Sequence, residues 1–358
     1  MRYILREPDD ASGIYLVFGN VLHNALEQLY EGKEDFKFLN EEFNRAKFES
    51  IDIAGLKFND ADAEKNKAIE NKYLTCLEHF SKNHHKEDRK VSSEQFIMTN
   101  ITEDNTTEHF MGYIDAVHVD YDKDDKGKDI AGSGTVYITD YKTSTRYTGA
   151  KIGEHANQLI LNALGISQSG NIPMSKIKAR WNFLKYVTVS YVQKNKKVKD
   201  TICERHEWVS KMEVSLRAKL KEFGIVDETE RDIMVLEAIN KNTMDNIPEE
   251  VRNAYTFDDA YVYVDLSPEN IAKVKKELMR IMKEIREKER SDNPDVWKVE
   301  VVDSMSYFCT QLCGYKSKCP CYKEYADERS LFIDKPKEEA NVVSDNDTSW
   351  MSELFDFS

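Results

Sequence analysis

The chain has 358 residues, of which 40% are hydrophobic, so it can form one large enzyme domain with insertions or roughly two or three ordinary domains. Asp and Glu total 65 against 51 Lys and Arg, which gives a formal net charge of −14. This charge excludes a protein that binds nucleic acid through its overall basicity, so any such contact must come from a local basic surface.

The sequence contains no apolar run of the roughly 18 residues that a membrane-spanning helix needs. The first residues also lack the apolar core of a signal peptide. Six cysteines are too few for a disulfide framework, and four of them lie between Cys309 and Cys321, a clustering typical of metal ligands. We therefore expect a cytoplasmic protein with no membrane partner and with a metal-binding segment near its C-terminus.

The N-terminal part is predicted to be helical. Apolar residues recur with helical spacing over residues 14–31, which predicts an amphipathic helix that carries His23. Charged, helix-favouring sequence follows to about residue 85. Three segments rich in β-branched and aromatic residues come next and predict an antiparallel meander: 91–99, 110–121 and 135–142.

The second half begins with another helix and strand. A helix is expected from about Gly153 to Leu164, and residues 177–192 predict a long apolar strand. The charged sequence 204–255 predicts a helical insertion, and Ser267 followed by Pro268 is typical of a helix start. This order of elements predicts an α/β fold with a mixed central sheet flanked by helices.

We divide the chain into five regions. They are an N-terminal helical region 1–90, an α/β core 91–203, a helical insertion and return helix 204–300, a cysteine segment 301–335 and an acidic tail 336–358 that we expect to be disordered. Residues 338–358 include six acidic residues and no basic one.

The strongest chemical signal lies at the ends of the second and third predicted strands, which carry Asp115 and the sequence Asp140-Tyr141-Lys142. Two carboxylates can together bind Mg²⁺ or Mn²⁺, and the carbonyl of Tyr141 can add a third oxygen. Lys142 follows Asp140 by two residues, on the same face of the strand, where its ammonium can orient or deprotonate a metal-bound water and stabilise a phosphate. The pattern predicts phosphodiester hydrolysis, and its alternative is a surface ion pair between Asp140 and Lys142.

These motifs resemble those of the PD-(D/E)XK nuclease superfamily. Within it they resemble the RecB-like branch, which includes the CRISPR-adaptation nucleases and the AddB-type recombination nucleases. The segment from Gly19 to His23 is similar to the G-x-x-x-H helix of this branch, and Glu94 is similar to its frequent strand glutamate. Gln158 matches the glutamine of its Q-x-x-x-Y helix, although the tyrosine position is occupied by Asn162.

The resemblance implies a restriction-endonuclease-like core and assigns roles to single residues. His23, Asp115, Asp140 and the carbonyl of Tyr141 would hold Mg²⁺ or Mn²⁺. Two further side chains, Glu94 and Lys142, would complete the catalytic set, and Gln158 would contact DNA. On its own, His23 is more typical of an ordinary helix-face histidine, and only its G-x-x-x-H context makes a metal ligand as good an interpretation. Glu94 is a weaker signal, because a solvent-facing glutamate on a strand is common.

Cys309, Cys313, Cys319 and Cys321 suit Zn²⁺ or an iron–sulfur cluster, both of which take four sulfur ligands. In the iron–sulfur members of the resembled branch, three C-terminal cysteines join one cysteine upstream of the G-x-x-x-H helix to hold a [4Fe–4S] cluster. No cysteine precedes His23 here, so the fourth ligand would be Cys321, Cys76 or Cys203, or would lie upstream of Met1. A structural Zn²⁺ bound by the four local cysteines is the alternative.

The resemblance implies a metal-dependent DNA nuclease. We expect an exonuclease that acts on DNA ends or single strands in recombination, repair, replication or CRISPR-like processing, in a prokaryotic or phage-infected cell. The alternative is a catalytically weak DNA- or protein-binding scaffold that retains the fold. The end of the chain, Glu353 to Ser358, resembles the acidic tips of bacterial-type single-strand-binding proteins, which dock replication and repair partners; a simple solubilising end is its alternative. The lysines at 194–199 and the basic helix 273–290 are candidate phosphate contacts.

Overall fold

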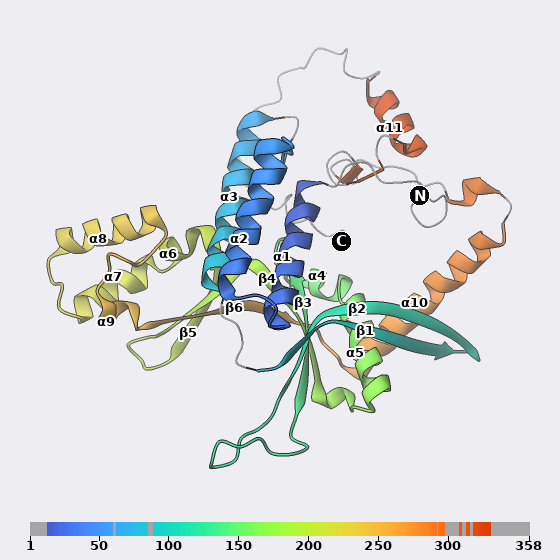
Figure 1. Ribbon diagram of the computed structural model, residues 1–358, viewed down its shortest axis with the longest axis horizontal. Helices are drawn as coiled ribbons and strands as arrows, with labels where there is room; N and C mark the ends of the chain where they lie inside the picture. The colour runs from blue at the N-terminus through green and yellow to red at the C-terminus, as the bar shows by residue number, and fades with distance from the viewer. Residues whose placement is uncertain are drawn as a thin grey trace.

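The computed structural model describes residues 13–59, 62–84, 89–291, 293–297, 308–309, 313–315 and 318–330. Its centre is a six-stranded sheet of order β1-β2-β3-β4-β5, with β6 paired to β4 (Figure 1). The strands are β1 Val91–Glu103, β2 Thr106–Asp120, β3 Thr135–Lys142, β4 Ile177–Val192, β5 Val198–Glu204 and β6 Tyr255–Tyr263. The pairing of β3 with β4 is parallel, and the other strand pairs are antiparallel.

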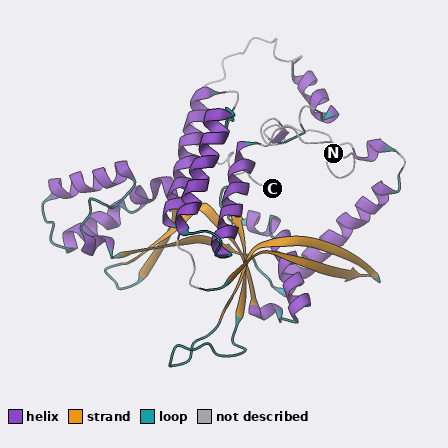
Figure 2. Ribbon diagram, viewed as in Figure 1, coloured by secondary structure: helices purple, strands orange, loops and turns teal. Residues whose placement is uncertain are grey.

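Helices cover both faces of this sheet (Figure 2). One face carries α1 Ile14–Tyr30, α2 Phe36–Lys47 and α3 Ala63–Asn83. The other face carries α5 Asn157–Gly170, which follows the short α4 Ala150–Glu154, and α10 Pro268–Glu289. The architecture is therefore the mixed α/β fold that the sequence predicts.

The helical spacing of apolar residues explains how α1 is held. Phe18, Leu22 and Leu26 follow one another every four residues, so they lie on one face of the helix, and all three are fully buried against α2, α3 and the sheet. The polar residues between them, including His23, then lie at the margin of this contact. Burial of α1 thus fixes which side chains it presents to the strand ends.

The sequence between β5 and β6 forms a helical unit beside the sheet (Figure 1). Its helices are α6 Trp208–Lys211, α7 Glu213–Glu222, α8 Glu228–Lys241 and α9 Glu249–Arg252. They enclose a core of their own, in which Trp208, Leu216 and Val235 pack against Val187 and Val189 of β4. The helical insertion was predicted, but β5 and β6 at its two ends were not.

Several predicted elements agree with the structure. The helix at 14–30, the strands at 135–142 and 177–192 and the helix opened by Ser267 are confirmed, and the side-chain oxygen of Ser267 accepts a hydrogen bond from the Asn270 amide. The first two strands are longer than predicted, because they continue as a hairpin to a turn at residues 104–105. The bounds predicted for a helix at 153–164 are wrong. The helix is interrupted between α4 and α5, and α5 then runs to Gly170.

Among the described residues, no helix is both long and apolar enough to cross a membrane. The acidic tail at 336–358 and most of the segment 298–317 lie outside the described residues. The four clustered cysteines are described, and Cys321 lies in the first turn of α11 Pro320–Ser330.

A buried ion pair joins the insertion to the sheet. Arg205, which follows β5, is only 3% exposed; its guanidinium donates to the carbonyl of Leu184 on β4 at 3.0 Å and to Asp259 on β6 at 3.1 Å. Burial lowers the pKa of Arg205, and the charge of Asp259 partly offsets this effect. The pair therefore connects the end of β5 to the middle of β4 and of β6 through one charge that is removed from water.

We expect Asp259→Ala to lower the free energy of unfolding by about 3–5 kcal/mol, because it leaves the Arg205 charge buried without its carboxylate. Urea denaturation followed by circular dichroism measures this change. Asp258→Ala is the matched control: its neighbouring carboxylate is exposed, so its effect should stay within about 1 kcal/mol. Equal effects of the two substitutions would contradict the assignment.

Candidate metal centre

The C-terminal end of β3 meets β2 at Asp115, inside that strand, and both lie next to the middle of α1. The Nε2 atom of His23 lies 2.8 Å from the carbonyl oxygen of Tyr141, to which it donates. The other ring nitrogen, Nδ1, lies 3.4 Å from Oδ2 of Asp115, and the same oxygen accepts the Tyr141 amide at 2.8 Å. A helix and two strands are thus joined through one histidine, one carboxylate and one peptide group.

These atoms form a donor set that fits a hard divalent cation. Oxygen ligands of Mg²⁺ lie at about 2.0–2.1 Å from the ion, so adjacent ligands of one ion are about 3 Å apart. The separation of 3.4 Å between His23 Nδ1 and Asp115 Oδ2 is close to this value. In the neutral form with Nε2 protonated, Nδ1 carries a lone pair on the side of Asp115.

Asp140 and Lys142 form a second pair beside the first. Their side chains alternate with Tyr141 along β3, and Lys142 Nζ lies 3.1 Å from Asp140 Oδ2. Asp140 is 3% exposed, so this is a buried ion pair and not the surface pair that the sequence left open. The tyrosine between them is buried on the opposite side, against α1–α3.

The two carboxylates are close enough to affect each other's protonation. Burial raises the pKa of Asp115 to about 6, and the negative charge of Asp140 contributes to the rise, whereas His23, the Tyr141 amide and Lys142 oppose it. Burial disfavours the ammonium of Lys142, but the charge of Asp140 outweighs this effect and raises the pKa of Lys142. The pocket therefore holds excess negative charge that a divalent cation would stabilise.

Glu94 reaches the same region by an unusual backbone conformation. It lies in β1 between two residues that pair with the neighbours of Asp115, so it is opposite Asp115 in the hairpin. Its φ of 46° is in the left-handed region, which is uncommon for a residue other than glycine and typical of functional positions. Burial and the charge of Glu27 raise the pKa of Glu94, and His23 lowers it, which places its carboxylate beside α1.

The hairpin of β1 and β2 packs on a different hydrophobic core on each side of Glu94 and Asp115. On one side the strands contribute to the core with α1–α3, and on the other side to the core with α5 and α10. The residues concerned are Val91 and Ala116 in the first core and Ile97 and Ile114 in the second. The irregular backbone at Glu94 thus coincides with the change of face, as strand irregularities near active sites do.

Glu27 is a site residue that the sequence reasoning missed. It lies one helical turn after His23 on α1, is half-buried, and is close enough to Glu94 to raise the pKa of that carboxylate. The spacing of four residues from His23 is the signal that could have identified it, because residues at this spacing share a helix face.

Gln158 occupies the first turn of α5, where its side chain is exposed. Asn162, one turn later, is buried among the apolar residues of α5. Exposure is compatible with a contact to DNA, and the DNA-binding role of Gln158 stays a prediction. Gly19, the glycine of the G-x-x-x-H segment, lies where α1 approaches Thr143 after β3, and a Cβ there would meet its Oγ1 at an ordinary 3.7 Å.

The cysteines of the C-terminal segment are free thiols. Burial raises the pKa of Cys309, and the charges of Cys313 and Cys319 raise it further. No three of the four sulfur atoms lie within 4.8 Å of one another, so a bound metal would have to draw them together. Such a set of thiols is chemically suited to Zn²⁺ or an iron–sulfur cluster. Cys203, by contrast, packs in the core of the helical insertion, and Cys76 Sγ lies 3.6 Å from the His206 ring on the other side of α3.

In the described part of the chain, one group of three possible metal ligands has all its donor atoms within 4.8 Å of one another: Glu204, His206 and Glu207. It lies at the end of β5, outside the predicted site. His23, Glu94, Asp115 and Asp140 include no group of three with donor atoms that close together. Glu204 already forms an ion pair with Lys72 at 2.7 Å, so the charge that would attract a cation there is partly neutralised.

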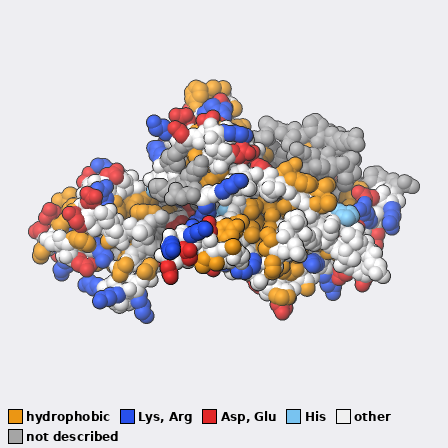
Figure 3. Space-filling view, turned by 60° about the horizontal axis from the view of Figure 1, so that its bottom comes forward, with side chains coloured by type: hydrophobic (Ala, Val, Ile, Leu, Met, Phe, Trp, Pro, Cys, Tyr) orange, Lys and Arg blue, Asp and Glu red, His pale blue; other side chains and the backbone are white. Residues whose placement is uncertain are grey.

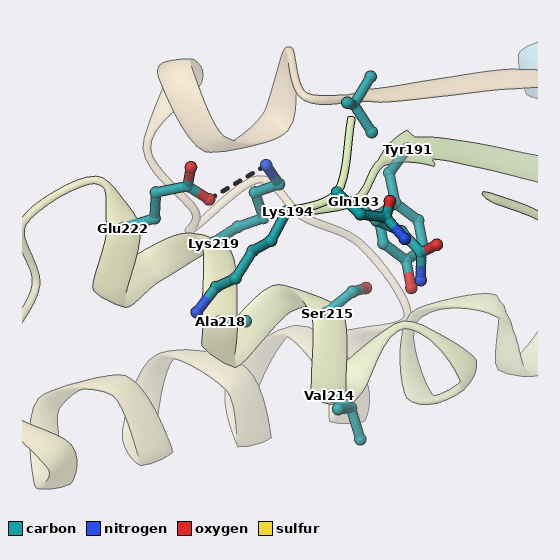
Figure 4. Close-up of a pocket in the computed structure, with 10 residues that line it drawn as sticks. Tyr191, Gln193, Lys194, Val214, Ser215, Ala218, Lys219 and Glu222 are labelled. Atoms are coloured by element: carbon teal, nitrogen blue, oxygen red, sulfur yellow. Dashed lines mark hydrogen bonds and ion pairs between the residues drawn. The ribbon is translucent and has the colours of Figure 1, made fainter. Parts of the chain in front are cut away.

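The basic turn between β4 and β5 lies at the far end of the sheet. With α7 it lines a cavity of about 370 Å³, which includes Lys194, Lys219 and Tyr191 (Figure 4). Lys219 is paired with Glu222 at 3.1 Å. Lysine and arginine side chains are visible on the surface of this part of the molecule (Figure 3), which is a basic surface separate from the metal centre.

A family model described as the PD-(D/E)XK nuclease superfamily matches residues 1–320 of the chain. No curated protein and no solved structure matches it at a significant level. The match covers the metal centre and the cysteines up to Cys319, so the assignment rests on most of the chain and not on one motif.

We expect Asp115→Asn and His23→Ala each to weaken Mn²⁺ binding at least about 10-fold, because the first removes a negative charge and the second a donor nitrogen from the centre. Titration with Mn²⁺ followed by electron paramagnetic resonance measures the affinity. Glu207→Gln is the matched control, since it alters the second group of ligands only. Loss of binding in the control, with normal binding in the other two variants, would place the metal at the end of β5.

Proposed function

Because the chain belongs to the PD-(D/E)XK nuclease superfamily, we propose that this metal-dependent nuclease is an exonuclease that hydrolyses DNA at ends or in single strands. The observation that carries the proposal is the meeting of His23, Asp115 and the Tyr141 carbonyl with the Asp140–Lys142 pair where the end of β3 meets β2. A scaffold role would not require this combination of acidic, imidazole and ammonium groups.

His23 through Nδ1, Asp115 and Asp140 would hold Mg²⁺ or Mn²⁺, with Glu94 as an additional carboxylate. The carbonyl of Tyr141, which the sequence offers as a further ligand, accepts the Nε2 proton of His23 and would orient its ring. The bound cation supplies a Lewis acid for the phosphate and lowers the pKa of water at the site. Hydrogen bonds from His23 to Tyr141 and from Tyr141 to Asp115 fix the orientation of these ligands before substrate arrives. Such preorganisation reduces the rearrangement that the reaction requires.

Lys142 would act as a positive charge beside the ligands. The charge of Asp140 raises the pKa of Lys142 despite the opposing effect of burial, which favours the ammonium form. An ammonium can donate hydrogen bonds to the attacking water and to a phosphate oxygen, and so align them while the negative charge on phosphorus increases. Of the two roles open from the sequence, orientation of water is therefore the one we propose.

The cellular role belongs to the same proposal: recombination, repair, replication or CRISPR-like DNA processing in the cytoplasm. Docking of a replication or recombination protein is assigned to the acidic tail 336–358, outside the described residues. For the cysteine segment we propose a [4Fe–4S] cluster held by Cys309, Cys313, Cys319 and Cys321, with structural Zn²⁺ as the alternative. Its role would be to stabilise the C-terminal segment, because metal binding contributes directly to folding.

We expect Asp140→Ala and Lys142→Ala each to reduce cleavage at least about 100-fold, since each removes a charge that acts in the transition state. The assay follows end-labelled single- and double-stranded DNA with Mg²⁺, Mn²⁺ or EDTA. Asp129→Ala and Lys123→Ala, which break an exposed ion pair between β2 and β3, are matched controls and should cleave normally. DNA binding by the native chain without metal-dependent cleavage would favour the scaffold role.

The cluster has its own test. Protein purified without oxygen should absorb broadly in the visible range, and Cys313→Ala or Cys319→Ala should remove the absorbance and lower the melting temperature. Cys203→Ala, at a buried position in the insertion, should leave the absorbance unchanged. A colourless native protein with stoichiometric zinc would show that the alternative is correct.

A further inference from the structure

One face of the β1–β2 hairpin exposes an unusual amount of apolar surface. Phe96 is 49% exposed, Met98 51%, Met111 72% and Tyr113 59%. These four side chains form two neighbouring cross-strand pairs, Phe96 with Tyr113 and Met98 with Met111. We call them the exposed stripe. Contiguous apolar surface of this kind on a soluble protein is typical of a binding site.

The exposed stripe is held rigidly from behind. The opposite face of β1 packs on α5, where Ile97 and Ile101 are buried and the Thr99 hydroxyl donates to the carbonyl of Leu161. Gly165 of α5 lies so close to β1 that a Cβ there would come within 2.6 Å of Thr99 Oγ1. Because alternate residues of a strand face opposite sides, burial of this face fixes the other face outward.

The exposed stripe begins at the metal centre. Asp115 follows Tyr113 of β2 by the two-residue period of a strand, and Glu94 precedes Phe96 of β1 by the same period. Both carboxylates lie on the face of the hairpin that is nearer to α1. Asp115 contacts His23 of this helix, and the charge of His23 lowers the pKa of Glu94. The hairpin then projects from the foot of α1 beyond α5 (Figure 1). The same face of two strands therefore carries the catalytic carboxylates and, next to them, the aromatic pair.

The two rings of the exposed stripe suit flat, stackable ligands. The rings of Phe96 and Tyr113 are 5.5 Å apart and inclined at 62°, so they leave ring surface open to solvent. Beyond the methionines the same face becomes polar, with Asn100 hydrogen-bonded to His109 at 2.6 Å. Arg286 of α10 pairs with Glu108 at 3.1 Å on the opposite face of β2, so it adds no cation to the exposed stripe. Exposed aromatic rings on which bases can stack are a common means of binding single-stranded nucleic acid, and they act without sequence preference.

We propose that the exposed stripe is a stacking platform for the unpaired bases of single-stranded DNA, and that it leads the strand to the carboxylates. The inference rests on the proposed nuclease function and adds the class of substrate. Bases within a duplex already stack on one another, so only an unpaired strand offers its faces to Phe96 and Tyr113. Continuity with Asp115 and Glu94 favours a nucleic-acid strand over a protein partner or a second copy of the chain.

The test measures DNA binding in the Asp140→Ala background, so that cleavage does not interfere. Fluorescence anisotropy gives the Kd for labelled oligothymidine and for a blunt duplex of the same length. Phe96→Ala with Tyr113→Ala should raise the Kd for the single strand about 100-fold, about 10-fold for each ring, and change the Kd for the duplex by less than about 3-fold. Fluorescence of 2-aminopurine in the strand should be quenched by the parent chain and not by this variant.

Two matched variants separate stacking from folding and from general apolar exposure. Phe96→Tyr with Tyr113→Phe keeps both rings and should retain the parent Kd. Phe48→Ala with Phe223→Ala removes two phenylalanines that are 56% and 48% exposed elsewhere, and should also leave the Kd unchanged. Urea midpoints equal to that of the parent would show that all variants fold.

An unchanged Kd for the single strand after loss of both rings overturns the platform, and so does an equal loss on the duplex. Concentration-dependent dimerisation that the double substitution abolishes, with the single-strand Kd unchanged, would assign the exposed stripe to a second copy instead. Cleavage is scored separately in the native chain. Metal-dependent cleavage with an unchanged Kd overturns the platform alone, whereas the expected change in Kd without cleavage overturns the proposed function alone.

Discussion

The repulsion between two buried carboxylates is the constraint on which the centre depends. Asp115 and Asp140 lie where the end of β3 meets β2, with little access to water, and the cost appears as the raised pKa of Asp115, to which burial contributes most and Asp140 adds. The described contacts oppose this cost from three directions: His23 from α1, the Tyr141 amide from β3, and Lys142 beside Asp140. Three charges or dipoles relieve the repulsion only in part, and a divalent cation supplies the kind of charge that is still required.

The same constraint explains why the strands are irregular at this point. Asp115 must face α1 to meet His23, while Ile114 before it packs on α5. The left-handed backbone of Glu94, opposite Asp115, lies where the hairpin passes from one core to the other. Such a conformation is costly for glutamate, about 1 kcal/mol or more, and persists where the surrounding structure holds it. Beyond it the regular alternation resumes, which is why Phe96 and Tyr113 face outward in line with the carboxylates.

Periodicity made part of this arrangement predictable. The bounds predicted for the strand at 177–192 are confirmed, because the segment is rich in aromatic and β-branched residues. The pairing of Asp140 with Lys142 follows from the two-residue period of a strand. β6 was missed because Asp258 and Asp259 interrupt its apolar pattern; the second of these aspartates binds Arg205, a residue distant in sequence. Glu27 shares a helix face with His23 by its four-residue spacing, but its effect on Glu94 arises from a contact between two elements that is not visible in either segment alone. Sequence therefore identifies the chemistry more readily than the tertiary contacts that arrange it.

The two buried groups of charges have different roles, one in stability and the other at the metal centre. Arg205 and Asp259 neutralise each other where the insertion meets the sheet, so that junction needs no further ligand. At the metal centre the acidic groups outnumber the basic ones. Asp115 is therefore not fully neutralised by its neighbours, and its pKa is raised. A protein whose net charge is −14 must also overcome repulsion from a polyanionic substrate. Stacking on uncharged rings provides affinity that does not depend on net charge, and this is the physical reason to expect aromatic contacts next to an acidic centre.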